Sequence, residues 1–556
     1  MADSPKDQVI YFAETDSRNN RKKFGIKTED RSKHVYVIGK TGMGKSTLLE
    51  NMAIQDIQNG NGIAFIDPHG GTAEKLLDFV PKERIKDVLY FAPFDTEYPV
   101  AFNVMEDVGA NKRHLVVSGL MSAFMKLFGE ESFSDRMQYI LQNTILALLE
   151  YPGSTMLGIN KMLVDKEYRK NVIANITDPS VKAYWTQEYA GYTERFAAEA
   201  IPAIQNKIGQ FTSNPLIRNI IGQEKSSFNL RKIMDEKKIV IVNLSKGRVG
   251  EDNARLLGSM LITKIYLAAM SRADERASSL AKLPPFFLYV DEFQSFADKS
   301  FADILSEARK YKLNLTMAHM YIEQMEEEVR DAVFGNVGTM IVFRVGAYDA
   351  DVLEKEFAPV FIAEDLVNLG LRQIYLKLMI DSVASPPFSA TTMPPMQSSE
   401  VSHTEEIIEY SRKTFAQPRS EVEKRITDWH EAGRVAVKTA PPRVFSAPPI
   451  VKPQEKRPIE KVILPVMPAH AGQVGSKIEP KPLPSISLET LKKSTDNQRK
   501  PDAKHVADLR DALRAMTGNQ PKLETPPQPQ VQPVHPQPTI KKEPSQEELK
   551  KILDVQ

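Results

Sequence analysis

Short apolar runs alternate with longer stretches of helical periodicity along most of the chain. The first set of runs covers residues 9–13, 34–38, 62–66 and 87–91. After a long interval the runs resume at residues 238–244, 286–290, 313–318, 339–343 and 374–378. Apolar runs of this length between helical stretches are typical of strands buried in a parallel sheet with helices on both faces. The pattern therefore predicts an α/β fold with a mostly parallel sheet.

The interval between the two sets of runs shows helical periodicity only. Examples are the stretches at residues 136–150, 180–189 and 199–211. This order of elements predicts one core, residues 34–110 and 234–398, interrupted by an all-helical domain inserted at residues 111–233. Residues 1–33 are expected to supply one N-terminal strand and a charged lead-in to the core.

The pattern changes again after the core. Residues 399–440 contain two short stretches typical of helices, at 405–412 and 421–429. Residues 441–556 hold 20 of the 37 prolines and 19 Lys/Arg against 13 Asp/Glu, which gives this tail a net charge near +6. Such a composition buries too little apolar surface to offset the entropy of ordering, so we expect disorder. Residues 505–516 and 546–553 could form helices on a partner, or remain fluctuating tail helices.

Overall composition narrows the classes of function. The formal net charge of +1 gives no global basic field, so any contact with nucleic acid has to come from a local patch or an assembled ring. The absence of cysteine excludes disulfides, cysteine-ligated zinc and thiol catalysis. No apolar run approaches the roughly 18 residues of a spanning helix, and the N-terminus lacks a signal-peptide pattern. We expect a cytoplasmic protein that reaches the inner face of the cell membrane only through a partner.

Residues 39–46 read GKTGMGKS, a complete Walker A motif, between the apolar run 34–38 and a helical stretch that begins near Lys45. Glycines let such a loop curl so that its backbone N–H groups face a phosphate chain. Lys45 would reach the β- and γ-phosphates, and the hydroxyl of Ser46 would bind Mg²⁺. The motif predicts a site for ATP and Mg²⁺ built from Gly39, Lys40, Thr41, Gly42, Met43, Gly44, Lys45, Ser46 and Thr47.

A phosphate loop also needs a carboxylate at the end of a neighbouring strand, and Asp291 and Glu292 follow the apolar run 286–290. In this arrangement Asp291 would hold Mg²⁺ through its water shell, and Glu292 would polarise the water that attacks the γ-phosphate. The alternative is an acidic helix N-terminus stabilised by the helix dipole. A paired Asp-Glu favours repeated ATP hydrolysis over a slow GTP switch.

Other polar residues are candidates for the same site. Asp67 could contribute to Mg²⁺ geometry from the strand beside the loop, or cap a turn. Arg309 could act on a neighbouring subunit's nucleotide, or be a solvated cation at a helix end. Arg31 and Arg344 are further candidates for phosphate contact, whereas His319 alone fits a structural role better than a catalytic one.

Taken together, these motifs resemble the FtsK/HerA clan of ring-forming, DNA-pumping ATPases. Within that clan they look closest to the type IV secretion coupling proteins of the TraG/TraD-like branch. The resemblance covers about residues 24–395 and rests on GKTGMGKS, on IDPHG at 66–70 and on the helical insertion. It also rests on NLSKGRVGEDNARLLGSML at 243–261, FLYVDEFQSF at 287–296, LSEARKYKLNLTMAH at 305–319 and FRVGAYDAD at 343–351.

The resemblance implies a RecA-like P-loop core that assembles as a hexamer, with ATP between subunits and DNA in a central channel. It implies an ATPase that delivers DNA, or a DNA–protein complex, to a type IV secretion, conjugation or pilus machine. The helical insertion or the tail would contact secretion, pilus or relaxosome proteins. Carried over by position, Arg309 is the arginine finger, which joins Lys45 and Glu292 as a catalytic residue.

Two departures from the family pattern keep alternatives open. The N-terminal transmembrane pair usual in coupling proteins is not found. Met320 occupies the position of a glutamine that senses the γ-phosphate, and a thioether cannot donate a hydrogen bond. Gln324, one helical turn on, could replace it if the loop shifts. The alternatives are a HerA-like motor for DNA-end processing with a nuclease, and a nucleotide-gated assembly scaffold with weak hydrolysis.

Overall fold

The computed structural model describes residues 8–16, 21–106, 108–398 and 401–432. The predicted tail at residues 441–556, with its two helical stretches, lies outside these described residues. Within the described part of the chain, no helix combines the length and the apolar character that crossing a bilayer requires.

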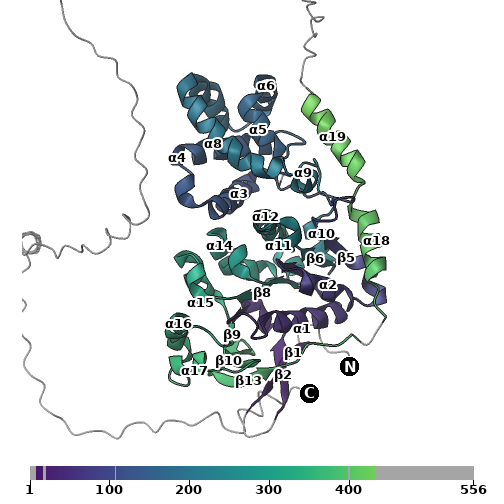
Figure 1. The fold of residues 1–556 in the computed structure, drawn as a ribbon, viewed down its shortest axis with the longest axis vertical. Helices are drawn as coiled ribbons and strands as arrows, with labels where there is room; N and C mark the ends of the chain where they lie inside the picture. The colour runs from purple at the N-terminus through teal and green to yellow at the C-terminus, as the bar shows by residue number, and fades with distance from the viewer. Residues whose placement is uncertain (1–7, 17–20, 107, 399–400, 433–556) are drawn as a thin grey trace, which may run out of the picture. The chain divides into compact units, whose positions relative to one another are not determined.

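One large mixed sheet organises the described residues (Figure 1). Its strand order is β2-β1-β13-β10-β9-β3-β8-β7-β4-β6-β5, and all neighbours from β9 to β5 are parallel, whereas those from β2 to β9 are antiparallel. The strands are β1 (Val9–Thr15), β2 (Lys23–Lys27), β3 (Val35–Ile38), β4 (Gly62–Asp67), β5 (Val88–Phe91), β6 (Ile239–Asn243), β7 (Phe286–Val290), β8 (Leu313–His319), β9 (Thr339–Val342), β10 (Gln373–Lys377) and β13 (Phe388–Thr392). A small hairpin joins β11 (Met379–Ile380) and β12 (Val383–Ala384).

Helices cover both faces of this sheet, as the apolar runs predict. Successive side chains of a strand point to opposite faces, so Val35 and Val37 pack with one buried cluster and Tyr36 and Ile38 with the other. On the first face lie α1 (Lys45–Gln58) and α2 (Gly71–Leu77). On the second lie α12 (Glu251–Met270), α14 (Ser300–Glu307) and α15 (Glu327–Asn336). The predicted fold class, a P-loop α/β core, is confirmed.

A group of helices stands between β5 and β6 in the sequence and packs against α12 (Figure 1). Contact between α3 and α12 is close, because a Cβ at Gly119 would lie 2.5 Å from Cγ2 of Thr263. Several helices of this group, namely α4, α6, α7, α9 and α10, have side-chain caps at their N-termini; Ser134, for example, accepts a hydrogen bond from the Met137 N–H at 3.3 Å. The helices are α3 (Arg113–Phe128), α4 (Asp135–Leu149), α5 (Leu157–Val164), α6 (Lys166–Asn175), α7 (Pro179–Ala183), α8 (Glu194–Thr212), α9 (Pro215–Ile221) and α10 (Leu230–Asp235).

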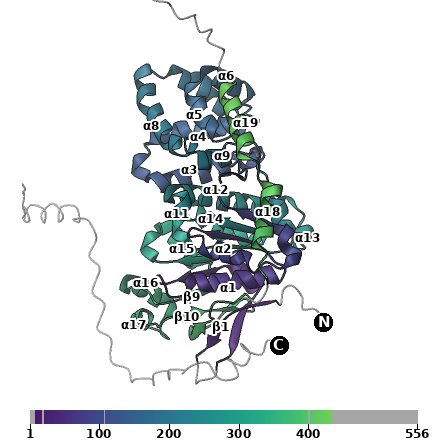
Figure 2. The ribbon, with the colours of Figure 1, turned by 45° about the vertical axis from the view of Figure 1, so that its right-hand side comes forward.

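The last two described helices lie against earlier parts of the chain (Figure 2). Helix α18 (Thr404–Phe415) packs beside β5, where the Ser411 hydroxyl accepts a hydrogen bond from the Tyr90 N–H at 3.0 Å. Helix α19 (Arg419–Glu431) reaches the helical group, where Trp429 packs edge-on against Tyr168. Remaining helices are α11 (Lys246–Val249), α13 (Ala277–Leu280), α16 (Ala347–Phe357) and α17 (Ala363–Val367).

The N-terminal part differs from the sequence-based expectation. Residues 23–27, expected in a charged lead-in, form the edge strand β2 instead. Strand β13, at residues 388–392, was not predicted either. Both belong to the antiparallel side of the sheet, where only one set of alternate side chains is buried, so neither is an apolar run.

Candidate functional site

The phosphate loop connects β3, which ends at Ile38, to α1, which begins at Lys45. Strands on both sides hold it: the Gly39 N–H donates to the His319 carbonyl at 3.2 Å, and the Lys40 N–H to the Arg344 carbonyl at 2.8 Å. A Cβ at Gly39 would lie 2.5 Å from Cβ of Phe343, so this position requires glycine. The loop is therefore clamped at its start, while its middle stays open to a ligand.

Lys45 is only 5% exposed although it carries an ammonium group. Its Nζ donates to the Lys40 carbonyl at 3.3 Å, inside the loop. Burial lowers the pKa of Lys45, and the nearby carboxylates of Glu292 and Asp291 oppose that shift. A largely desolvated cation that rests on a single backbone carbonyl of its own loop is suited to binding a phosphate.

Ser46 and Asp291 meet at one point of the site. The Ser46 hydroxyl donates a hydrogen bond to the Asp291 carboxylate, which is 2% exposed. Burial raises the pKa of Asp291 to about 6, and the charges of Asp67 and Glu292 add to this effect, whereas the Ser46 hydrogen bond opposes it. A buried carboxylate beside a hydroxyl, with further negative charge near it, fits a hydrated Mg²⁺.

The strand order corrects one expectation about this site. Asp291 and Glu292 were expected on the strand next to the phosphate loop, but β8 lies between β3 and β7. The carboxyl ends of parallel strands meet at the same edge, so the carboxylates still reach the loop across β8. As a result, the residues that follow β8 lie between the loop and the two carboxylates.

Met320 is one of these residues. The Thr41 hydroxyl of the phosphate loop contacts the Met320 sulfur at 3.6 Å. Just before it, the His319 side chain is fully buried and its Nδ1 lies 2.9 Å from the Tyr36 hydroxyl. Burial, with the charges of Lys45 and Lys126 adding to it, lowers the pKa of His319 to about 3. His319 is therefore neutral, in agreement with a structural role, and Gln324 lies exposed in the following turn.

Glu292 has an unusual backbone. Its φ of 49° and ψ of 51° lie in the left-handed region, which non-glycine residues rarely adopt outside special sites. The Glu292 N–H donates to Oδ1 of Asp291 at 3.0 Å, and the Glu292 carboxylate accepts a hydrogen bond from the amide of Gln294. This conformation turns the chain sharply out of β7 and brings the carboxylate close enough to act on the charge of Lys45.

Asp67 forms a cap. Its two carboxylate oxygens accept hydrogen bonds from the His69 N–H at 2.8 Å and the Ala73 N–H at 2.9 Å, at the start of α2. Its strand, β4, is not beside the loop as expected but beyond β8 and β7. Of the two readings of Asp67, the geometry supports capping, and its charge contributes to the environment of Asp291.

The three candidate arginines lie in different places relative to the phosphate loop. Arg31 is 1% exposed, pairs with Asp56 at 2.9 Å and stacks over the ring of Phe287, so the idea that it contacts phosphate is wrong. Arg344 lies beside the loop through its carbonyl. Arg309 is exposed in the turn before β8. That turn is at the opposite edge of the sheet from Lys45, about 20 Å away along a seven-residue strand. Arg309 and Lys45 of the same subunit therefore cannot contact one nucleotide.

Two residues at the site were not singled out from the sequence. Arg372 takes a left-handed φ of 64°, and its N–H donates to the Met43 carbonyl of the phosphate loop at 3.2 Å. Gln294 holds Glu292, as described above. Arg372 belongs to no local motif and is brought to the site by the strand order, whereas Gln294 lies within FLYVDEFQSF at 287–296, a motif that by itself assigns it no role. Only the pairing of distant segments could have revealed Arg372.

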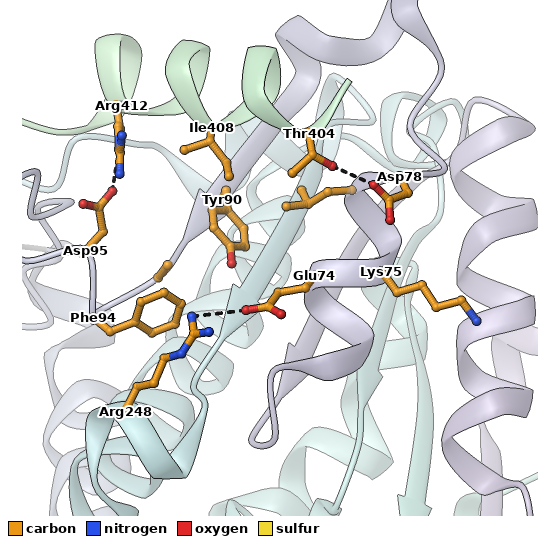
Figure 3. Close-up of a pocket in the computed structure, with 12 residues that line it drawn as sticks. Glu74, Lys75, Asp78, Tyr90, Phe94, Asp95, Arg248, Thr404, Ile408 and Arg412 are labelled. Atoms are coloured by element: carbon orange, nitrogen blue, oxygen red, sulfur yellow. Dashed lines mark hydrogen bonds and ion pairs between the residues drawn. The ribbon is translucent and has the colours of Figure 1, made fainter. Parts of the chain in front are cut away.

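A separate pocket of about 650 Å³ lies between α2, the segment after β5 and α18 (Figure 3). Its charged side chains pair with one another: Arg248 with Glu74 at 3.2 Å, and Arg412 with Asp95 at 2.6 Å. The Thr404 hydroxyl donates to Asp78 at 2.9 Å. No residue of the phosphate loop and neither Asp291 nor Glu292 lines this pocket. Its internally matched charges do not point to an ionic ligand.

Comparison with known proteins agrees with this description. Residues 19–265 match the family model described as the central domain of helicase HerA. The structure is similar to the plasmid coupling protein TrwB in complex with a non-hydrolysable GTP analogue, at 14% identity and a TM-score of 0.51, covering 72% of this chain and 98% of that one. No protein of curated function matches the sequence.

Two further structures are more distant. TrwB with ADP and Mg²⁺ has a TM-score of 0.49 at 14% identity, covering 72% of this chain and 99% of that one. VirB4 of Thermoanaerobacter pseudethanolicus has a TM-score of 0.44 at 13% identity, covering 70% and 97%. The HerA domain match and the fold shared with TrwB agree with the resemblance stated above: residues 19–265 are similar to the central domain of helicase HerA, and the described residues have the fold of a plasmid coupling protein.

Proposed function

We propose that the chain is an ATPase that moves DNA, or a DNA–protein complex, into a type IV secretion, conjugation or pilus machine. The observation that carries this proposal is the convergence of Lys45, Ser46, Asp291 and Glu292 at one edge of the sheet. Repeated ATP hydrolysis needs groups that hold Mg²⁺, a cation that binds the phosphates and a carboxylate that activates water. Ser46 and Asp291 can hold Mg²⁺, Lys45 supplies the cation, and Glu292 supplies the carboxylate.

Each residue has a distinct role in the proposed reaction. Lys45 and the backbone N–H groups of residues 39–47 bind the phosphates, and Ser46 and Asp291 hold Mg²⁺. Bound Mg²⁺ would neutralise the charge that develops on the phosphates. Glu292 orients the attacking water and accepts its proton. We place the γ-phosphate between Lys45 and Glu292, because the Glu292 carboxylate is close enough to oppose the lowering of the Lys45 pKa by burial.

Assembly is part of the proposal. Arg309 lies exposed at the edge of the sheet opposite Lys45, so it can serve only a neighbouring subunit's nucleotide. The family pattern makes that assembly a homohexamer with DNA in its channel. We assign secretion, pilus or relaxosome partners to the inserted helical domain at residues 111–233 or to the tail at 441–556. Such a protein would act in the cytoplasm, at the inner face of the membrane through a partner.

Stimulation of hydrolysis by DNA tests the proposed function. Purified protein should hydrolyse ATP in the presence of Mg²⁺, and single- or double-stranded DNA should raise the rate severalfold. DNA binding should weaken steeply as salt rises, because contacts with phosphate release counterions. Phosphate release would be measured with each DNA at two salt concentrations. A rate that no nucleic acid changes would contradict the coupling of hydrolysis to DNA.

Met320→Gln is expected to raise kcat about tenfold, equivalent to about 1.4 kcal/mol of transition-state stabilisation. The Met320 sulfur contacts Thr41 of the phosphate loop and cannot donate a hydrogen bond, whereas a glutamine amide there could donate to the γ-phosphate. Met320→Leu, which has a similar size and no donor, serves as control and should match the wild type. Equal rates for the Gln and Leu variants would show that residue 320 does not reach the phosphate.

A further inference from the structure

Gln294 lies two residues after Glu292, in the short turn Phe293–Ser295 that leads out of β7. This turn is held rigidly. Phe293 and Phe296 are fully buried on either side of it, and the Phe296 carbonyl accepts a hydrogen bond from the Ser259 hydroxyl at 3.1 Å. The main chain at Gln294 is therefore fixed, so its side chain projects from a constant point.

A second anchor comes from the segment that follows β6. Lys246, just after β6, donates from Nζ to the Ser295 hydroxyl at 3.2 Å. The turn is thus fastened to α12 on one side and to α11 on the other. Side chains carried by rigid elements hold functional groups more accurately than side chains on free loops.

The amide of Gln294 has one possible orientation. Its Nε2 donates to Oε2 of Glu292, whereas its Oε1 is buried and has no hydrogen-bond partner. Rotating the amide by 180° would place its carbonyl oxygen against the carboxylate, and two acceptors repel each other. The charge-assisted hydrogen bond to Glu292 therefore fixes the orientation of the amide, although it leaves the amide oxygen Oε1 without a hydrogen-bond partner.

The Glu292 carboxylate needs the hydrogen bond from Gln294 because it could otherwise adopt two other positions. It starts from a left-handed backbone, and the ammonium of Lys45 lies close enough to affect it. Before a nucleotide binds, an untethered carboxylate could move onto Lys45 or out into water. The Gln294 amide occupies Oε2 and leaves Oε1 for another partner.

We propose that Gln294 is the positioning residue for Glu292 in ATP hydrolysis, an inference that rests on the proposed function. Its amide holds Oε2 so that Oε1 faces the attacking water. In the step it supports, the water oxygen bonds to the γ-phosphorus, and the bond from that phosphorus to the bridging oxygen of ADP breaks. The proton released by the water passes to Oε1 of Glu292.

Gln294→Met tests the proposal, because methionine keeps the length of the side chain but removes the donor. The expected result is a loss of about tenfold or more in kcat, with KM for ATP, affinity for a non-hydrolysable ATP analogue and melting temperature unchanged. The control is Gln138→Met in the helical group, where the amide likewise donates one hydrogen bond, in this case to the Phe133 backbone carbonyl at 3.1 Å. That variant should keep the kcat of the wild type.

A double variant separates positioning from a general structural effect. In the Glu292→Gln background, Gln294→Met should cause no further loss, because the group that it positions is already disabled. An unchanged kcat for Gln294→Met alone, or a loss seen in analogue affinity instead of kcat, would overturn the proposal while leaving the proposed function intact. A wild-type protein without any turnover, by contrast, would overturn the proposed function and this role with it.

Discussion

Lys45→Ala is expected to abolish ATP hydrolysis, with a fall in kcat of about a thousandfold or more. Lys45 is 5% exposed, and its ammonium group is held inside the phosphate loop by the Lys40 carbonyl. An ammonium in a site from which water is largely excluded stabilises developing phosphate charge far more than it would in water. A thousandfold corresponds to about 4 kcal/mol of lost transition-state stabilisation.

The fold should survive this substitution. Burial lowers the pKa of Lys45, so the surroundings of the ammonium disfavour its charge, and removing it relieves a desolvation cost. Phosphate release, nucleotide affinity and the melting curve would be measured together. Lys232→Ala, at a lysine that is 71% exposed on α10, is the matched control and should leave the rate unchanged. Turnover within tenfold of the wild type in Lys45→Ala would contradict the proposed reaction.

The parallel half of the fold could be predicted because its strands are buried on both faces. The run at residues 286–290 is apolar throughout and the run at 313–318 is mostly apolar, and both form strands close to the expected limits. By contrast, β2 reads KFGIK and β13 reads FSATT. These strands bury only alternate side chains, so neither stands out as an apolar run. Their pairing with β1 depends on contacts between residues far apart in the chain.

The candidate site divides in the same way. Lys45, Ser46, Asp291 and Glu292 belong to short motifs, and motifs are local, so the sequence was enough to nominate them. The position of β8 between β3 and β7 is not local, and the expectation of a neighbouring strand failed for that reason. The role of Arg31 also depends on residues that are distant in the sequence.

An arginine just before a phosphate loop is equally compatible with a ligand contact and with burial. Here the carboxylate of Asp56, near the end of α1, lies 2.9 Å from the Arg31 guanidinium, and the hydroxyl of Tyr289 accepts a further hydrogen bond at 2.7 Å. Both partners are brought in by tertiary packing. The choice between the two roles was therefore settled by segments that the neighbouring sequence does not specify.

Glu292→Gln is expected to lower kcat by about a hundredfold to a thousandfold while ATP still binds. The amide keeps the size of the side chain and can still accept a hydrogen bond from Gln294, but it cannot take a proton from the attacking water. Lys45, Ser46 and Asp291 remain in place, so affinity for ATP and Mg²⁺ should change little. The variant should therefore accumulate in its ATP-bound state, and complexes with DNA should last longer than those of the wild type.

Phosphate release and equilibrium ATP binding, measured on the same preparation, would separate the two effects. Glu131→Gln, at an exposed glutamate in the turn before α4, provides a control with the same change of charge and should hydrolyse ATP normally. Loss of ATP binding in Glu292→Gln would mean that this carboxylate shapes the binding site and does not serve as the base. Near-normal turnover would mean that a group other than Glu292 accepts the proton. Asp291 is not that group, because it is already engaged by Ser46.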